Sequence, residues 1–396
     1  MQKKRSPIPA VYLHIPFCRT ICPFCSFTVR RDRAKMHEKY IRGMVDEIDR
    51  RAEMLKDMER KENEEKLSGQ ILLKSIYIGG GTPSCLTIPE VSVLLTKVRE
   101  NFPWSDQIEI AFEMNPDDVN PEYLSGLADI GVNRLSLGGQ SFQTSTLQNL
   151  GRCHTVADLR NAIAVITNSS FDNWNLDLMF GIPEQSIVMF KNDVEEALRY
   201  EPSHISLYGL EIHERTPFGN NPQIRNWEPE HLEQFEEMYL WATDNLEKAG
   251  LFQYEISNFS KKTNEGRQNL LVWSGQEYLG FGVGAHSYHR QTRWGNVRSI
   301  RTYLQHLGQN TWPTEFIEQL SAKQLAVEFL MLGLRQCEGI NIKEWQTRYG
   351  LHLQNQQLNF VQELCDDGRA FWEGQHLCLT PKGMLLADRI TVQLMP

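Results

Sequence analysis

The feature that most constrains the fold is an alternation of short apolar runs with amphipathic helical patterns over the N-terminal half of the chain. The runs are rich in β-branched and aromatic residues, which is typical of buried strands. Repeated strand–helix units imply parallel strands joined by right-handed crossovers. We therefore predict an α/β fold, either an open or partial (β/α)6 barrel or a doubly wound sheet. The predicted strands are 11–15, 75–78, 108–113, 133–137, 174–179 and 204–209.

Helix start signals lie between these strands. Thr87 followed by Glu90 forms a capping box, and Asn120 before a proline supplies an N-cap. Thr155, with Asp158 in the first turn, is a third start of the same kind. These signals predict a helix after each of three strands.

Polar and glycine-rich segments follow all six predicted strands. Parallel strands present their carboxyl ends at one rim, where α/β proteins place their active sites. We therefore expect these segments to meet at one site. They are residues 14–18, 79–84, 113–116, 138–142, 177–183 and 208–211.

Several residues at this rim are suited to ligand contacts. The glycines at 79–81 would let a charged ligand approach the main chain, although a tight turn explains them as well. Glu113 and Asp177 need a ligand or an ion-pair partner if they are buried. Gln140 could bind a ribose, and Arg152 could clamp a carboxylate or lie on the surface.

Three cysteines directly follow the first predicted strand, in the pattern Cys18-x-x-x-Cys22-x-x-Cys25. Three thiolates around a cubane of four irons leave one iron open to a small ligand. A structural zinc site would need a fourth ligand and commonly a second close pair, and no such pair follows. The spacing favours an iron–sulfur cluster over zinc.

Composition narrows the class further. The net charge of −9 argues against a general nucleic-acid-binding protein. No apolar run approaches the length of a membrane-spanning helix. Eight cysteines without a recognisable secretory leader are expected in a reducing compartment such as the cytoplasm.

The motifs as a set resemble the radical S-adenosylmethionine (SAM) proteins related to oxygen-independent coproporphyrinogen III oxidase. The resemblance begins with Tyr-x-His-Ile-Pro-Phe-Cys at residues 12–18 and extends over nearly the whole chain. The other matching segments are Gly79–Ser84, Glu113–Pro116, Gln140–Phe142, Leu150–His154, Asp177–Pro183, Tyr254–Phe259 and Gly280–Ser287.

This resemblance implies cofactors and their contacts. Cys18, Cys22 and Cys25 would hold a [4Fe–4S] cluster, whose open iron would bind SAM and donate the electron that cleaves it. An electron donor such as flavodoxin or ferredoxin would be needed. The residues implied to contact SAM are Tyr12, Phe24, Gly80, Gly81, Thr82, Glu113, Gln140, Arg152 and Asp177.

One position favours a subgroup. The oxidases carry a fourth cysteine two residues after the last cluster ligand, where this chain has Phe27, the pattern of the HemW group of heme chaperones. The resemblance therefore implies heme or another tetrapyrrole as ligand, a heme-acceptor apoprotein as partner and a role in porphyrin metabolism. Oxidase chemistry on coproporphyrinogen III or another tetrapyrrole is the alternative, which leaves enzymatic activity open.

The heme signature of that group, His-Asn-x-x-Tyr-Trp, is only partly present. Gln268 and Val272 replace its histidine and tyrosine, while Asn269 and Trp273 match. Imidazole is a common axial ligand of heme iron, so we consider His286 as a substitute ligand.

The pattern changes after residue 220. A helix is predicted at 228–249, a linker at 291–312 and a helix at 321–336, followed by a hairpin around 371–379. Helices followed by a hairpin predict a winged-helix-like accessory domain. The expected domains are a radical SAM core at 1–220, a barrel extension with linker at 221–312 and the accessory domain at 313–396.

Overall fold

The structure is a computed structural model that describes residues 8–61 and 72–396. The chain divides into two compact units, each built from separate stretches of sequence. The first holds the chain up to Gly138, then 152–172 and 276–319. The second holds 139–151, 173–275 and 320–396. The α/β class is confirmed in both.

The first unit contains a mixed sheet with a parallel centre, in the order β14-β13-β12-β11-β1-β4-β5-β6. Strands β11, β1, β4, β5 and β6 run parallel, while β12 to β14 continue as an antiparallel meander. The strands are β1 Ala10–Ile15, β4 Leu73–Gly80, β5 Trp104–Met114, β6 Arg134–Gln140, β11 Tyr278–Phe281, β12 His286–His289, β13 Thr292–Asn296 and β14 Thr314–Gln319.

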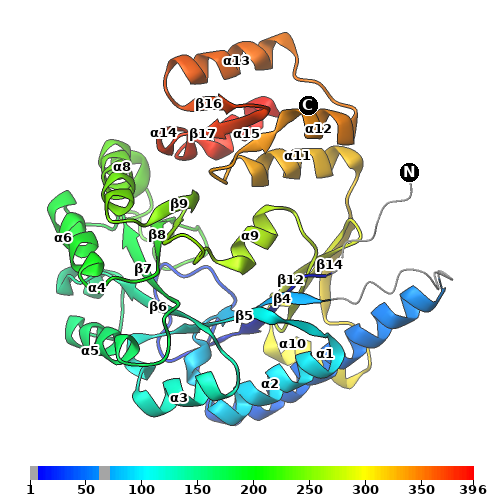
Figure 1. The fold of residues 1–396 in the computed structure, drawn as a ribbon. Coiled ribbons are helices and arrows are strands. Elements are labelled where there is room, and N and C mark those ends of the chain that lie inside the picture. Colours follow the sequence, from blue (N-terminus) through cyan, green and yellow to red (C-terminus); the bar gives the residue numbers. More distant parts are fainter. Residues whose placement is uncertain (1–7, 62–71) are drawn as a thin grey trace. The chain divides into compact units, whose positions relative to one another are not determined.

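Helices pack against this sheet through apolar stripes. Helix α2 buries Val91, Leu94, Leu95 and Val98, which recur at helical spacing, and α1 lies beside both α2 and α10 (Figure 1). Each such side chain contributes roughly 1.5–3 kcal/mol by leaving water. The helices are α1 Ala34–Lys61, α2 Ile88–Asn101, α3 Pro121–Asp129, α5 Val156–Thr167 and α10 Ile300–Gly308, with short turns η1 Pro83–Cys85 and η2 Pro116–Asp118.

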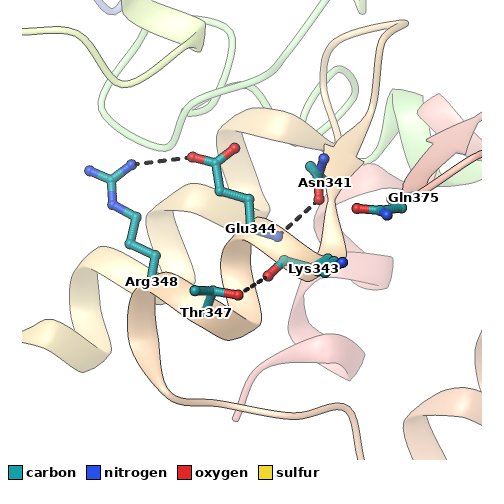
Figure 2. Close-up of a pocket in the computed structure, with 6 residues that line it drawn as sticks. All are labelled: Asn341, Lys343, Glu344, Thr347, Arg348 and Gln375. Carbon is teal, nitrogen blue, oxygen red and sulfur yellow. Dashed lines mark hydrogen bonds and ion pairs between the residues drawn. The ribbon is translucent and has the colours of Figure 1, made fainter.

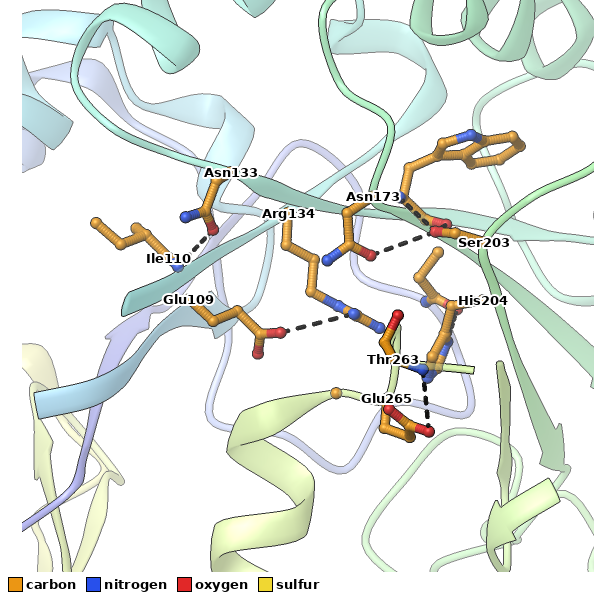
Figure 3. A network of polar contacts seen from close by, with 12 residues as sticks. Glu109, Ile110, Asn133, Arg134, Asn173, Ser203, His204, Thr263 and Glu265 are labelled. Carbon is orange, nitrogen blue, oxygen red and sulfur yellow. Dashed lines mark hydrogen bonds and ion pairs between the residues drawn. The ribbon is translucent and has the colours of Figure 1, made fainter. Parts of the chain in front are cut away.

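The amino-terminal ends of the strands in this unit are also tied by polar contacts (Figure 3). Arg134 at the start of β6 pairs with Glu109 on β5 at 3.6 Å, and both side chains are buried. Asn133 accepts a hydrogen bond from the Ile110 amide and donates to the Ile108 carbonyl. These contacts fix the register of two parallel strands away from the polar rim.

The second unit contains β7 Trp174–Phe180 and β8 His204–Gly209, which are parallel, and β10 Asn258–Ser260 and β9 Phe252–Glu255, which complete the order β7-β8-β10-β9. All six strands predicted from the sequence are thereby confirmed. The helices around these strands are α4 Thr144–Asn149, α6 Ile187–Leu198, α7 Trp227–Glu230, α8 Leu232–Lys248 and α9 Arg267–Trp273.

The C-terminal part of this unit is the winged-helix-like module that the sequence predicts. Trp345 is fully buried in its core and donates its indole N–H to the Ala326 carbonyl at 3.0 Å. The module consists of α11 Ala322–Gly333, α12 Ile342–Tyr349, α13 Asn355–Asp366, α14 Pro381–Met384 and α15 Ala387–Leu394, with the sheet β15 Ile340–Asn341, β17 His376–Leu379 and β16 Ala370–Glu373.

Two predicted segments need correction. The expected linker at 291–312 is wrong, because it contains strand β13 and helix α10, the latter capped by Ser299. The expected helix at 228–249 is broken at His231, whose ring stacks on Trp227 and bonds to the Trp227 carbonyl. Among the described helices, none is both long and apolar enough to cross a membrane.

Candidate cluster and cofactor site

The three cysteines lie on a loop that closes on itself through two short strands. Cys18 ends β2 (Phe17–Cys18), which pairs in parallel with β3 (Arg30–Arg31) so that Cys18 stands opposite Arg31. The Asp32 amide donates to the Cys18 carbonyl at 2.8 Å. The Cys25 amide donates to the Cys22 carbonyl at 3.1 Å, which makes a turn between the two. The loop therefore has a fixed base and presents three thiols from eight residues.

The glycine run after β4 brings main chain against the first thiol. The Gly81 amide donates to the Ile15 carbonyl at 2.7 Å, and a β-carbon at Gly81 would lie 2.8 Å from the Cys18 sulfur. Gly80 has a φ of +121°, which favours glycine, and a β-carbon there would lie 2.6 Å from the His14 ring. The run is more than a plain turn, because the site requires the absence of these side chains.

His14 secures the far end of the cysteine loop. Its Nε2 donates to the Thr28 carbonyl at 2.8 Å, and its Nδ1 accepts from the Tyr12 hydroxyl at 2.9 Å. Burial lowers the pKa of His14 to about 4, so the ring is neutral and this pattern of donor and acceptor is fixed. Thr28 also packs against Gly284, where a β-carbon would lie 2.3 Å from the Thr28 hydroxyl.

A chain of polar side chains leads from one thiol to another. The Thr82 hydroxyl donates to the Cys18 sulfur at 3.6 Å, and Asn115 donates its amide N–H to that hydroxyl at 3.2 Å. Arg152 donates to the Asn115 carbonyl oxygen at 2.7 Å and to the Cys22 sulfur at 3.6 Å. Thr82, Asn115 and Arg152 therefore link the Cys18 sulfur to the Cys22 sulfur.

The three thiols differ in exposure: Cys18 is buried, whereas Cys22 and Cys25 are partly buried. Burial raises the pKa of Cys18 to about 11, against the lowering effect of the Thr82 hydrogen bond, and burial also raises the pKa of Cys25. A buried thiolate is therefore unfavourable by itself, whereas coordination to a metal deprotonates a thiol outright. In the described residues, no group of three or more His, Cys, Asp or Glu side chains converges as a site for one metal ion.

Beyond the thiols, the ends of β1, β4 and β5 form a polar corner. Glu113 accepts from the Tyr77 hydroxyl at 2.7 Å and from the Gly80 amide at 3.0 Å. The Tyr12 and Tyr77 rings stack with centroids 6.2 Å apart, and burial holds the pKa of Tyr12 well above its usual value. The Glu113 carboxylate is thus oriented by a hydroxyl and a main-chain amide.

A buried carboxylate stands behind this corner. Glu47 on α1 accepts from Tyr303 at 2.6 Å, from Asn296 at 2.6 Å and from the Gly282 amide at 2.9 Å. Burial raises the pKa of Glu47, against the lowering effect of these hydrogen bonds. Tyr40, seven residues earlier on α1, donates its hydroxyl hydrogen to the His14 carbonyl at 2.8 Å. Helix α1 therefore holds both β1 and the glycine segment after β11.

The remaining predicted SAM contacts fall in different places. Phe24 lies half-buried in the cysteine loop of the first unit. Gln140 and Asp177 belong to the second unit. Gln140 has a φ of +68°, in the left-handed region, and Asp177 accepts from Asn175 at 2.7 Å. The first unit by itself brings together the cysteines, Tyr12, the glycine run, Thr82, Glu113 and Arg152.

The predicted heme residues are divided between the two units. Asn269 and Trp273 lie on α9 of the second unit, where Gln268 is buried and its amide oxygen has no hydrogen-bond partner among the described residues. His286 begins β12 in the first unit, exposed and edge-on to Phe316 at 5.3 Å between ring centroids.

A separate shallow pocket lies on the winged-helix-like module (Figure 2). Its polar groups mostly satisfy one another: Asn341 caps the Glu344 amide, and Glu344 faces Arg348 at 4.0 Å. None of the predicted site residues lines it. The lining residues are Asn341, Lys343, Glu344, Thr347, Arg348 and Gln375.

Comparison with known proteins identifies the family. A heme chaperone HemW from Bacillus subtilis is 32% identical over 96% of this chain and 97% of its own length. The chain belongs to the HemW family. HemW from Escherichia coli is 33% identical over 71% of this chain and 70% of its own. The radical SAM superfamily pattern matches residues 12–197, and the HemN C-terminal domain matches 320–386.

A solved structure agrees with this fold. Coproporphyrinogen III oxidase HemN from Escherichia coli, a radical SAM enzyme, superposes with a TM-score of 0.80 over 100% of this chain and 91% of its own, at 20% identity. At this identity the likeness concerns the fold alone. It establishes the radical SAM architecture with its C-terminal accessory domain for this HemW family member.

Radical SAM proteins bind a [4Fe–4S] cluster and SAM, and the first unit fits both. The Arg152 Nε–H is buried without a hydrogen-bond partner in the described residues, so a donor is left over beside the thiols. Gly81 lets main chain lie directly against the Cys18 sulfur, where a β-carbon would be only 2.8 Å away. Cysteine sulfurs are the usual ligands of iron–sulfur clusters, and here Cys18 is buried while Cys22 and Cys25 are partly buried.

Two contributors to the site were not among the predicted contacts. Asn115 lies in the Glu113-x-Asn115 motif. Because it follows the predicted ligand contact Glu113 by two residues at the same strand end, the sequence could have indicated it as a site residue. His14 stands in the first motif between Tyr12 and Cys18. Its role in holding the cysteine loop depends on Thr28, a contact that no spacing rule indicates.

Proposed function

We propose that this chain is a heme chaperone of the HemW type, which holds a [4Fe–4S] cluster on Cys18, Cys22 and Cys25 and binds SAM and heme. The observation that supports it best is the cysteine loop contacted by Gly81 and Arg152, in a chain that aligns with HemW over nearly its whole length. We include heme as a ligand because the curated HemW relatives are named heme chaperones.

Each residue then has a defined task. Arg152 and Thr82 stabilise negative charge on the sulfurs of Cys22 and Cys18. When bound, the reduced cluster supplies the single electron that cleaves the sulfonium of SAM. The residues proposed to bind SAM are Tyr12, Phe24, Gly80, Gly81, Thr82, Glu113, Gln140, Arg152 and Asp177.

The proposal extends to partners and location. An electron donor such as flavodoxin or ferredoxin reduces the cluster, and an apoprotein receives the heme. All eight cysteines are free thiols, which fits a reducing cytoplasm. Asn269, Trp273 and His286 are the proposed heme contacts.

Anaerobic reconstitution tests the cluster. We expect iron and sulfide binding with broad visible absorption in the wild type, loss of both in Cys18→Ala, and retention in the control Cys365→Ala, whose cysteine lies on α13. Iron-free, zinc-loaded protein after anaerobic purification would refute the cluster assignment.

Heme titration tests the chaperone assignment. We expect stoichiometric heme uptake by the wild type and its transfer to an apo-cytochrome, without conversion of coproporphyrinogen III. Gln268→His should strengthen binding, because imidazole is a better iron ligand than a carboxamide. Failure of both proteins to bind heme, or turnover of coproporphyrinogen III, would overturn it.

A further inference from the structure

The segment that carries the cluster cysteines has a charge opposite to that of the whole chain. Residues 18–33 contain four arginines, 19, 30, 31 and 33, and a single acid, Asp32, whereas the chain has a net charge of −9. We call these four residues the arginine rim. A local excess of one sign on a protein of the other sign steers an oppositely charged partner.

The arginine rim is exposed and largely unpaired. Arg30, Arg31 and Arg33 are exposed, and none has an ion-pair partner in the described part of the chain. Arg19 pairs with Asp118, yet its side chain remains 54% exposed. These guanidinium groups are thus available to carboxylates from another molecule.

The one acid in the segment does not neutralise the rim. The Asp32 carboxylate accepts from His37 at 2.6 Å, and the other ring nitrogen of His37 faces Glu90 at 3.5 Å. Asp32 is therefore engaged by the buried His37 rather than by the neighbouring arginines.

Exposed apolar side chains accompany this charge. Phe27 is 69% exposed and Ile21 is 45% exposed, and both lie on the same cysteine loop. The Phe27 amide also donates to the Cys25 sulfur. Exposed apolar groups beside charged groups are typical of transient protein interfaces. Ile21 directly precedes Cys22, and Phe27 follows Cys25 by two residues, so a partner bound to these side chains would lie beside the cluster ligands.

We propose that the arginine rim, with Phe27 and Ile21, is the docking surface for an acidic one-electron carrier protein. Cys18 pairs directly with Arg31 across β2 and β3, which places the bound carrier next to a sulfur that holds the cluster. The carrier, a flavin or iron–sulfur protein, is oxidised by one electron, and the [4Fe–4S] cluster is reduced by one, from the 2+ to the 1+ state. This inference rests on the proposed cluster.

The test is charge reversal on the rim, with flavodoxin hydroquinone as the probe because flavodoxins are small acidic proteins. Arg30→Glu combined with Arg31→Glu should weaken association with the reconstituted protein about tenfold or more at low salt, and slow reduction of its cluster by a similar factor. The control is Arg301→Glu, which reverses a single exposed arginine on α10 of the same unit. It should behave as the wild type.

Two further measurements separate the outcomes. Reduction by dithionite, a small reductant that needs no docking surface, should proceed equally in all three proteins, which shows that the variants retain their cluster. Raising the salt concentration should weaken flavodoxin binding to the wild type until its affinity equals that of the double variant.

Unchanged association and unchanged cluster reduction in the double variant would overturn the docking surface and leave the proposed function intact. An equal loss in Arg301→Glu would overturn it too, because the effect would then reflect overall charge. If the wild type binds no cluster, the proposed function fails, whereas flavodoxin binding to that cluster-free protein still tests the surface. If the cluster-free wild type and the cluster-free double variant bind flavodoxin equally, the proposed docking surface is wrong, whatever the outcome for the cluster.

Discussion

A β-carbon on Gly81 would lie 2.8 Å from the sulfur of Cys18, closer than side-chain atoms normally approach. Gly81→Ala should therefore displace that sulfur or the strand end that carries it, and reduce cluster loading. Iron content and visible absorption after reconstitution measure this. Gly308→Ala, at a site with no neighbour within 4 Å, is the control and should load normally. Full iron content in Gly81→Ala would contradict the close packing.

Asn115→Ala should weaken SAM binding without removing the cluster. Asn115 connects the Thr82 hydroxyl to Arg152, so its loss frees a side chain proposed to clamp the ligand. Loss of one hydrogen bond to a charged group corresponds to about tenfold in affinity. Anaerobic calorimetry of SAM binding measures it, with Asn168→Ala at the exposed end of α5 as control. Equal affinities in all three proteins would exclude a positioning role for Asn115.

Glu47→Gln should lower the free energy of unfolding by about 3 kcal/mol, because an amide nitrogen replaces one of the oxygens that now accept from Tyr303, Asn296 and Gly282. Thermal unfolding of the cluster-free protein measures the change. Glu38→Gln on the same helix is the control. Its exposed pair with Arg42 should contribute less than about 1 kcal/mol. A similar midpoint for both variants would show that Glu47 is not a structural anchor.

Glu255 in the second unit should make stability depend on pH. Burial raises its pKa from 4.5 to about 7, against the lowering effects of hydrogen bonds from Asn258, the Ser257 amide and Trp273. Between these two values the folded protein keeps a proton that the unfolded chain releases. The stabilisation that this bound proton gives to the folded state is therefore fully present below pH 4.5 and is lost as the pH rises through about 7.

The measurement is the difference in unfolding free energy between wild type and Glu255→Gln at pH 5 and at pH 8. The wild type should lose up to roughly 3 kcal/mol more than the variant over this range. The neighbouring Tyr239 and Cys337 also have raised pKa values, the latter about 12, so they stay neutral. Parallel pH profiles would contradict the assignment.

The strands and the cysteine loop were predictable because their signals are local. Each parallel strand is a short apolar run followed by a polar segment, and three cysteines within eight residues limit the chemistry to few metals. The helix starts predicted at Thr87 and Thr155 are also present, each as a capping box, and Ser321 opens α11 in the same way. Their hydrogen bonds span only three residues, so sequence spacing is sufficient to find them.

The failures lie where the decisive contact is distant in sequence. Glu47 looks like an ordinary polar residue of a charged helix, yet its partners lie more than 230 residues further along the chain. Helix α10 was detectable, since Ser299 precedes Ile300, Tyr303 and Leu307 at helical spacing. The short strand β13 obscured it, because Thr292–Asn296 contains arginine and glycine and pairs only with other antiparallel strands.

The contact between Thr28 and Gly284 has a consequence for biogenesis. Thr28, at the end of the cysteine loop, packs against Gly284, which is synthesised some 250 residues later. Strand β11, which pairs with β1, is also synthesised at that late stage. A nascent chain that exposes only its N-terminal half thus lacks this packing partner of the cysteine loop. If the loop holds the proposed cluster, we expect iron insertion to follow translation of most of the protein.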